Sequence, residues 1–125
     1  MGSYWTLPSS STAASIATAL QTGTQTATIN TDHTLGTAVT TAGWYQLEVD
    51  GNAMANGDVL QLWIKELPLS GGTARIILFD AWYDAMDANN IILRLPELGS
   101  DQSWEAHLKQ SAGTGRAFPW KILQL

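Results

Sequence analysis

Two histidines and one cluster of aspartates are the residues best suited to chemistry in this chain of 125 residues. His33 and His107 lie far apart, and neither has a second ligand at a metal-binding spacing such as His-x-x-x-His. The serines lie in turns or in the first 31 residues, and none stands in the Gly-x-Ser-x-Gly elbow of a hydrolase. The chain has no cysteine, which excludes thiol nucleophiles and thiolate metal sites. We therefore predict no enzyme activity, no catalytic residue, no metal and no cofactor.

Asp80, Asp84 and Asp87 form the densest acidic cluster. Oxygen ligands in a loop could hold Ca²⁺, but the spacing is not that of an EF-hand and no bidentate Glu follows, so a solvated loop is the favoured interpretation. The glycine-rich residues 112–116 lack the Lys-Ser/Thr pair of a phosphate-binding loop. We expect them to form a hairpin turn.

Charge and hydropathy exclude two classes of partner. The net charge is −5, and the six basic residues are dispersed, whereas nucleic-acid binding requires clustered Lys and Arg. No apolar run reaches the roughly 18 residues of a membrane span, and the N-terminus lacks the pattern of a secretory signal. Only 14% of the residues are charged, against roughly a quarter in an average domain, which indicates that much of the surface faces protein.

The first 31 residues carry no charged side chain, and Asp32 is the first. Such a segment cannot bury enough apolar surface to fold alone. We predict an uncharged N-terminal arm at residues 1–31 on a body at residues 32–125. Residues 9–21 have the spacing of a short helix, followed by a polar strand or an extended linker. The apolar side chains expected to anchor the arm are Tyr4, Trp5, Leu7, Ile16 and Leu20.

The body alternates apolar and polar residues between turns rich in Gly, Pro and Asn. The expected strands cover residues 43–50, 59–67, 74–83, 91–95, 103–110 and 118–125. No long helical pattern interrupts them. This organisation predicts an all-β fold, a single antiparallel β-sandwich or jelly-roll-like domain preceded by the extended or partly helical arm.

Strand parity predicts where several aromatic residues point, because successive side chains on a strand face opposite ways. Trp104 shares a face with apolar neighbours and belongs to the core. Trp44 and Trp63 lie on polar faces, and a hairpin between their strands would set them opposite one another. The inward-facing residues of those two strands are Tyr45, Leu47, Val49, Leu60, Leu62 and Ile64.

Three interpretations of this tryptophan pair stay open. The arm or a loop could cover both rings, the pair could form a protein–protein contact, or it could be a platform on which sugar rings stack. The strand containing Trp82 is apolar on both faces, which indicates a strand covered on both sides. His107 is expected to be an exposed strand residue.

The C-terminal residues 108–125, LKQSAGTGRAFPWKILQL, resemble the ending of a set of small proteins from tailed bacteriophages. Residues 45–50, 56–60 and 69–73 carry the same resemblance, which covers roughly residues 24–125 and leaves the arm unmatched. It implies a phage structural protein, most naturally one that decorates or cements the capsid. The set has no shared functional motif, so the resemblance assigns no site residue.

Together these observations predict a virion protein that binds and stabilises the capsid shell through its arm and an aromatic surface. Its expected partners are the major capsid protein or other virion subunits, and a homo-oligomer such as a trimer suits a three-fold capsid site. It would be made in the host cytoplasm and reside on the capsid surface. The alternatives are a carbohydrate-binding module on a virion, or a head–tail, neck or tail component. The residues predicted to bind partners are Tyr4, Trp5, Leu7, Ile16, Leu20, Trp44 and Trp63.

Overall fold

The computed structural model describes residues 17–68 and 71–125, and these residues form nine β-strands and no helix. The strands are β1 (Thr18–Thr26), β2 (His33–Val39), β3 (Gly43–Asp50), β4 (Val59–Leu67), β5 (Arg75–Tyr83), β6 (Ile92–Arg94), β7 (Leu98–Ser100), β8 (Ser103–Ala112) and β9 (Ala117–Gln124). The predicted anchors Tyr4, Trp5, Leu7 and Ile16 lie outside the described residues.

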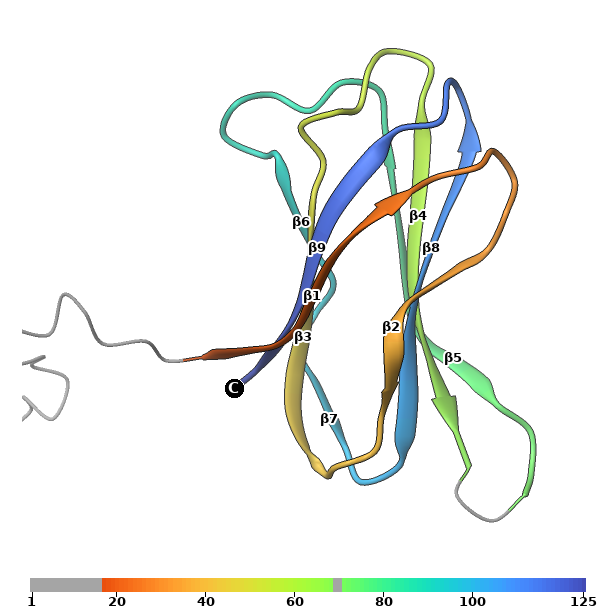
Figure 1. Cartoon of the computed structure of the whole chain (residues 1–125), viewed down its shortest axis with the longest axis vertical. Coiled ribbons are helices and arrows are strands. Elements are labelled where there is room, and N and C mark those ends of the chain that lie inside the picture. Colours follow the sequence, from red (N-terminus) through yellow and green to blue (C-terminus); the bar gives the residue numbers. More distant parts are fainter. Residues whose placement is uncertain (1–16, 69–70) are drawn as a thin grey trace, which may run out of the picture.

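The strands form two antiparallel sheets (Figure 1). Sheet A has the order β1-β9-β3-β6, with β7 also paired to β3, and sheet B has the order β2-β8-β4-β5. The first half of the chain pairs with the second half as one long hairpin: β4 with β5, β3 with β6 and β7, β2 with β8, and β1 with β9. Rolling this hairpin brings β9 beside β3 and β8 beside β4, which is the topology of a jelly roll. The predicted all-β sandwich is confirmed.

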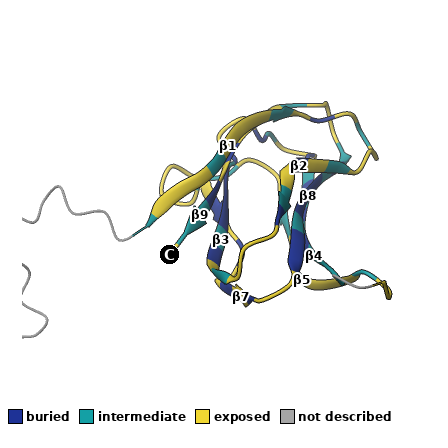
Figure 2. Ribbon diagram, turned by 60° about the horizontal axis from the view of Figure 1, so that its bottom comes forward, coloured by how far each residue is buried: buried dark blue, intermediate teal, exposed yellow. Residues whose placement is uncertain are grey.

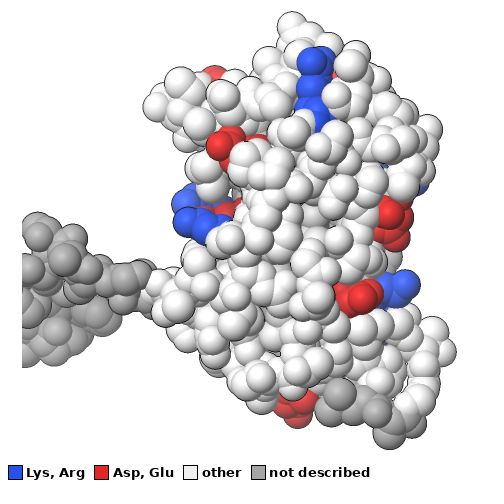
Figure 3. All heavy atoms as spheres, in the orientation of Figure 1, with Lys and Arg blue, Asp and Glu red and all other residues white. Residues whose placement is uncertain are grey.

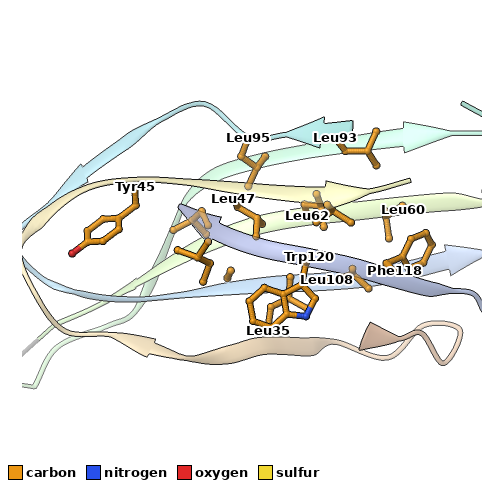
Figure 4. Packing of buried hydrophobic residues seen from close by; sticks show 14 of the residues in the cluster. Leu35, Tyr45, Leu47, Leu60, Leu62, Leu93, Leu95, Leu108, Phe118 and Trp120 are labelled. Atoms are coloured by element: carbon orange, nitrogen blue, oxygen red, sulfur yellow. The ribbon is translucent and has the colours of Figure 1, made fainter. Parts of the chain in front are cut away.

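Side chains from the inner faces of the two sheets fill the core (Figure 4). Figure 2 marks buried stretches along β3 and β8. The predicted inward-facing residues of β3 and β4 are all buried, and Trp104 of β8 is fully buried against Tyr45, with ring centroids 5.3 Å apart. Strand alternation therefore predicted the core correctly. Among the largest fully buried side chains are Trp104, Tyr45, Phe118, Leu35, Leu47, Leu60, Leu62 and Leu108.

Strand β1 is part of the sandwich, since it pairs with β9 along its length. Residues 18–26, which the uncharged pattern placed in the arm, are therefore a strand of sheet A, and residues 18–21 are not helical. The Gln21 side chain joins β1 to β2 across the seam between the sheets. Its Oε1 accepts the Thr37 N–H at 3.0 Å, and its Nε2 donates to the Thr37 carbonyl at 3.1 Å.

The indole of Trp120 seals the same seam from inside. A Cβ added to Gly23 of β1 or to Gly36 of β2 would approach its ring to 2.8 Å. Gly36 also has a φ of +67°, a conformation that favours glycine. Both positions therefore need glycine for β1 and β2 to close over Trp120.

A buried carboxylate organises one end of the sandwich. Asp58 Oδ2 accepts a hydrogen bond of 2.9 Å from Arg116 Nε and another of 2.9 Å from the Ala55 N–H. Its Oδ1 accepts the Thr114 N–H at 3.3 Å. The segment containing Thr114 and Arg116 joins β8 in sheet B to β9 in sheet A. The predicted hairpin turn is therefore wrong, because this turn crosses between the sheets.

We expect Asp58→Asn to lower the free energy of unfolding by about 2 to 3 kcal/mol at pH 7, because it breaks a buried ion pair. Burial raises the pKa of Asp58, but the hydrogen bonds from Arg116, Ala55 and Thr114 lower it more, so that the pKa lies below its ordinary value of 3.8. The carboxylate thus stabilises the fold fully above that value, and its contribution is lost as the pH falls through the lowered pKa.

Urea unfolding at pH 7 and at about pH 2 measures this effect. The difference between wild type and Asp58→Asn should shrink at the lower pH, and the exposed control Asp101→Asn should unfold like wild type at both. A difference that does not depend on pH would contradict the assignment.

Candidate functional site

Strand β5 exposes large apolar side chains at the open edge of sheet B. Within the described part of the chain it pairs only with β4. Ile76, Phe79 and Tyr83 are 57%, 55% and 61% exposed. Natural sheets normally protect long edge strands with charge, proline or a covering segment. The expectation that this strand is covered on both faces is wrong within the described residues, because Ile76, Phe79 and Tyr83 leave its outer face exposed. The strand also lies at an edge, since no described strand pairs with β5 on the side away from β4.

Three aromatic rings stack in a row across the outer face of sheet B. Trp63 of β4 lies opposite Phe79 of β5 and His107 of β8 in the strand register. The Trp63 and His107 rings are 5.4 Å apart and nearly parallel at 5°, and the Trp63 and Phe79 rings are 6.3 Å apart at 28°. We call Trp63, Ile76, Phe79, Tyr83 and His107 the aromatic face.

His107 is buried and supports Trp63, so the expectation of an exposed histidine is wrong. Its Nδ1 lies 2.8 Å from Asp32 Oδ1, and its Nε2 lies 3.1 Å from Glu105 Oε1. These two carboxylates fix the orientation of the imidazole ring on which Trp63 stacks. The histidine therefore positions an aromatic surface.

The backbone at the open edge of β5 is partly blocked. The Asp84 N–H points toward β4 and donates to the Asp58 carbonyl. Backbone N–H groups of successive residues point to opposite sides of a strand, so the Ala81 N–H, three residues earlier, points away from β4. The Asp80 carboxylate accepts that N–H at 2.8 Å. A partner strand could not pair along the whole edge without displacing this carboxylate. The geometry therefore favours contact through the side chains of the aromatic face.

The two predicted surface tryptophans lie on opposite sides of the molecule. Trp44 and Trp63 both face outward, as strand parity predicted, but β3 belongs to sheet A and β4 to sheet B. The predicted hairpin between them is wrong, because residues 51–58 cross from one sheet to the other. Leu20, the one predicted arm anchor within the described residues, is exposed at the start of β1.

The acidic residues around Asp84 accept hydrogen bonds from residues of the loops. Asp84 Oδ1 accepts the Gly57 N–H at 2.8 Å, and Asp87 accepts hydrogen bonds from Asn89 and Asn90. Over residues 17–68 and 71–125, no group of three His, Cys, Asp or Glu side chains could hold a metal ion. No helix long and apolar enough to cross a membrane occurs in those residues.

A scan against protein-family models, a search of curated proteins and a search of solved structures each found no match. The resemblance to small phage proteins therefore stays a prediction.

Ile76, Phe79 and Tyr83 were not among the residues predicted to bind a partner. Their strand was recognised from its composition, but its position at a sheet edge depends on pairings distant in sequence. The one feature of the sequence that could have indicated this surface is a run of residues, apolar on both faces, next to the Gly71-Gly72 turn. Of the two strands at the tip of the rolled hairpin, β4 gains β8 as a second partner, whereas β5 pairs with β4 alone among the described strands.

Truncating two phenylalanines distinguishes the aromatic face from the core. We expect Phe79→Ala to lower the free energy of unfolding by about 1 kcal/mol or less, since the ring is more than half exposed and its stacking contributes little. Phe118→Ala deletes the same atoms from a fully buried site and should cost about 3 to 5 kcal/mol. Urea unfolding of both variants measures the difference. Equal losses would show that Phe79 has a structural role.

Proposed function

We propose that this chain is a structural protein of a bacteriophage virion that decorates and stabilises the outer surface of the capsid shell. The observation that carries the proposal is the exposed apolar strand β5 beside the stacked ring of Trp63. Large exposed apolar patches mark interaction sites on soluble proteins, and aromatic residues are enriched at interface centres. The jelly-roll topology also occurs in viral shell proteins, although a fold alone does not determine function.

The size of the aromatic face suits one contact among several. Side chains of this size and exposure at Ile76, Phe79 and Tyr83 present on the order of 400 Å². A stable two-protein interface buries about 800 Å² on each partner. Since a little over half of such an interface is apolar, these three side chains supply most of the apolar part of one contact. The N-terminal residues preceding β1 would supply a second contact on the shell or on a neighbouring subunit.

The surface charge agrees with a protein partner. Figure 3 shows few charged side chains on the face it presents, with positive and negative atoms scattered rather than gathered. The net charge of −5 disfavours nucleic acid. The proposed partners are the major capsid protein or other virion subunits. A homo-oligomer such as a trimer suits this assembly. The protein would be made in the host cytoplasm and reside on the capsid surface.

A head–tail, neck or tail component is the alternative position in the virion. Such a component would also need an apolar docking face, so the aromatic face does not distinguish the two. The number of copies per virion does: a decoration protein follows the capsid lattice and is present in hundreds of copies, whereas a neck or tail component is present in few.

We expect Phe79→Asp to weaken attachment to purified shells lacking this protein by at least about tenfold, since it places a charge in an apolar contact. Co-sedimentation of added protein with the shells measures attachment. Trp44→Asp is the matched control, because it introduces the same charge at an exposed aromatic residue of the opposite sheet. It should attach like wild type. Normal attachment of Phe79→Asp, or loss of attachment in Trp44→Asp, would contradict the proposal.

A chain starting at Ala17 tests the N-terminal contact. A truncation at residue 31 would remove β1, whereas removal of residues 1–16 leaves every described strand in place. We expect the truncated protein to keep the unfolding midpoint of the full chain and to attach about tenfold more weakly. Undiminished attachment would show that the aromatic face acts without the N-terminal residues.

A further inference from the structure

The outer face of sheet A contains an open groove of about 590 Å³ that crosses β1, β9, β3 and β6. This volume lies within the range of small-ligand sites. Residues of β1 and β6 form its two sides. The groove lies on the opposite side of the molecule from the aromatic face, and nothing in the proposed attachment uses it.

A buried carboxylate with two cations forms the floor of the groove. Glu48 is 8% exposed and forms an ion pair with Arg94 Nε, and its other oxygen lies 3.4 Å from Lys121 Nζ. Within the part of the chain that the structure describes, Arg94 makes its side-chain hydrogen bond only through Nε. Its two NH₂ groups and the Lys121 ammonium, both on half-exposed side chains, remain able to donate to a ligand.

The charges that line the groove cancel. Glu48 and Asp50 balance Arg94 and Lys121, so the site has no net preference for an anion or a cation. Hydrogen-bond donors and acceptors stand side by side, next to apolar surface from Ile92. A neutral polyhydroxylated ligand matches this set, because its hydroxyl groups both donate and accept and its C–H faces are apolar.

Trp44 extends the same face along β3. It is 63% exposed, and its indole lies against Gly99 of β7, where an added Cβ would come within 2.9 Å of the ring. Three adjacent ring atoms, Cη2, Cζ2 and Cε2, lie 2.9 to 3.0 Å from that Cβ position, so the ring packs over Gly99 with one face while most of the side chain is open to solvent. Trp44, Gln46, Glu48 and Asp50 share one face of β3, spanning roughly 20 Å at about 3.3 Å per residue. This length suits an extended chain of sugars.

We propose that the outer face of sheet A binds a neutral oligosaccharide. One sugar stacks on Trp44, and the next sugars hydrogen-bond to Arg94, Lys121 and Asp50 in the groove. This site replaces the platform of Trp44 with Trp63 that strand parity suggested, since those rings lie on opposite sheets. The proposal is independent of attachment through sheet B, and the two can fail separately.

Titration of the full chain with chitotetraose, cellotetraose and maltotetraose tests the site, with tryptophan indole N–H signals followed by NMR. We expect at least one of these neutral tetrasaccharides to bind with a Kd of about 1 mM or tighter and to shift the Trp44 signal. Trp44→Ala and Arg94→Ala should each weaken binding by about tenfold, whereas the opposite-face control Trp63→Ala should leave it unchanged.

Three results would overturn the proposal. One is no binding of any of the three sugars up to about 10 mM. Another is unchanged affinity in Trp44→Ala or Arg94→Ala when their unfolding midpoints show that they are folded. The third is binding of inorganic phosphate in place of the sugars, which would identify an anion site.

Discussion

The pairing of the first half of the chain with the second half, as one antiparallel ribbon, is the constraint on which the rest of the structure depends. It fixes β4 and β5 as the tip of the ribbon and makes β5 an edge strand. It also sends the chain from one sheet to the other between β1 and β2, β2 and β3, and β3 and β4. Once the ribbon is rolled, the inner faces bury the core, and the apolar outer side chains of β5 have no described strand to cover them.

The alternation of apolar and polar residues predicted which side chains face inward. Pairing between strands distant in the sequence determined which sheet each strand joins and which strand lies at an edge. Alternation alone identified Tyr45 and Trp104 as core residues and Trp44 and Trp63 as outward-facing. It could not assign strands to sheets, so it set the two outer tryptophans together. His107 faces outward as its parity requires, yet it is buried because Trp63 stacks on it and Asp32, 75 residues away, closes its side.

The structure of the uncharged N-terminal segment also depends on pairing with a strand distant in the sequence. Its composition indicated an arm that continues from residue 21 as a polar strand or an extended linker. Residues 18–26 form a strand because β9, near the other end of the chain, supplies the hydrogen bonds. The Thr-rich β1 therefore owes its order to its partner and to the Gln21 contact with β2. The edge position of Phe79 likewise depends on where the second half of the chain returns.

The two outer faces differ in chemistry, and this division supports the account of function. Sheet B offers stacked and exposed apolar side chains for a protein partner, while sheet A offers balanced charges and one exposed indole. A subunit held to a shell through sheet B would leave sheet A facing away from it. In this account one small sandwich both attaches and displays a second surface.

Hydroxyl-radical footprinting of the protein, free and bound to shells, tests the central claim most directly, because it reports the solvent exposure of individual side chains. The account predicts that oxidation of Phe79 and Tyr83 falls strongly on attachment while oxidation of Trp44 is unchanged. Protection of Trp44 with undiminished oxidation of Phe79 and Tyr83 would contradict it, and would show that the shell contacts sheet A.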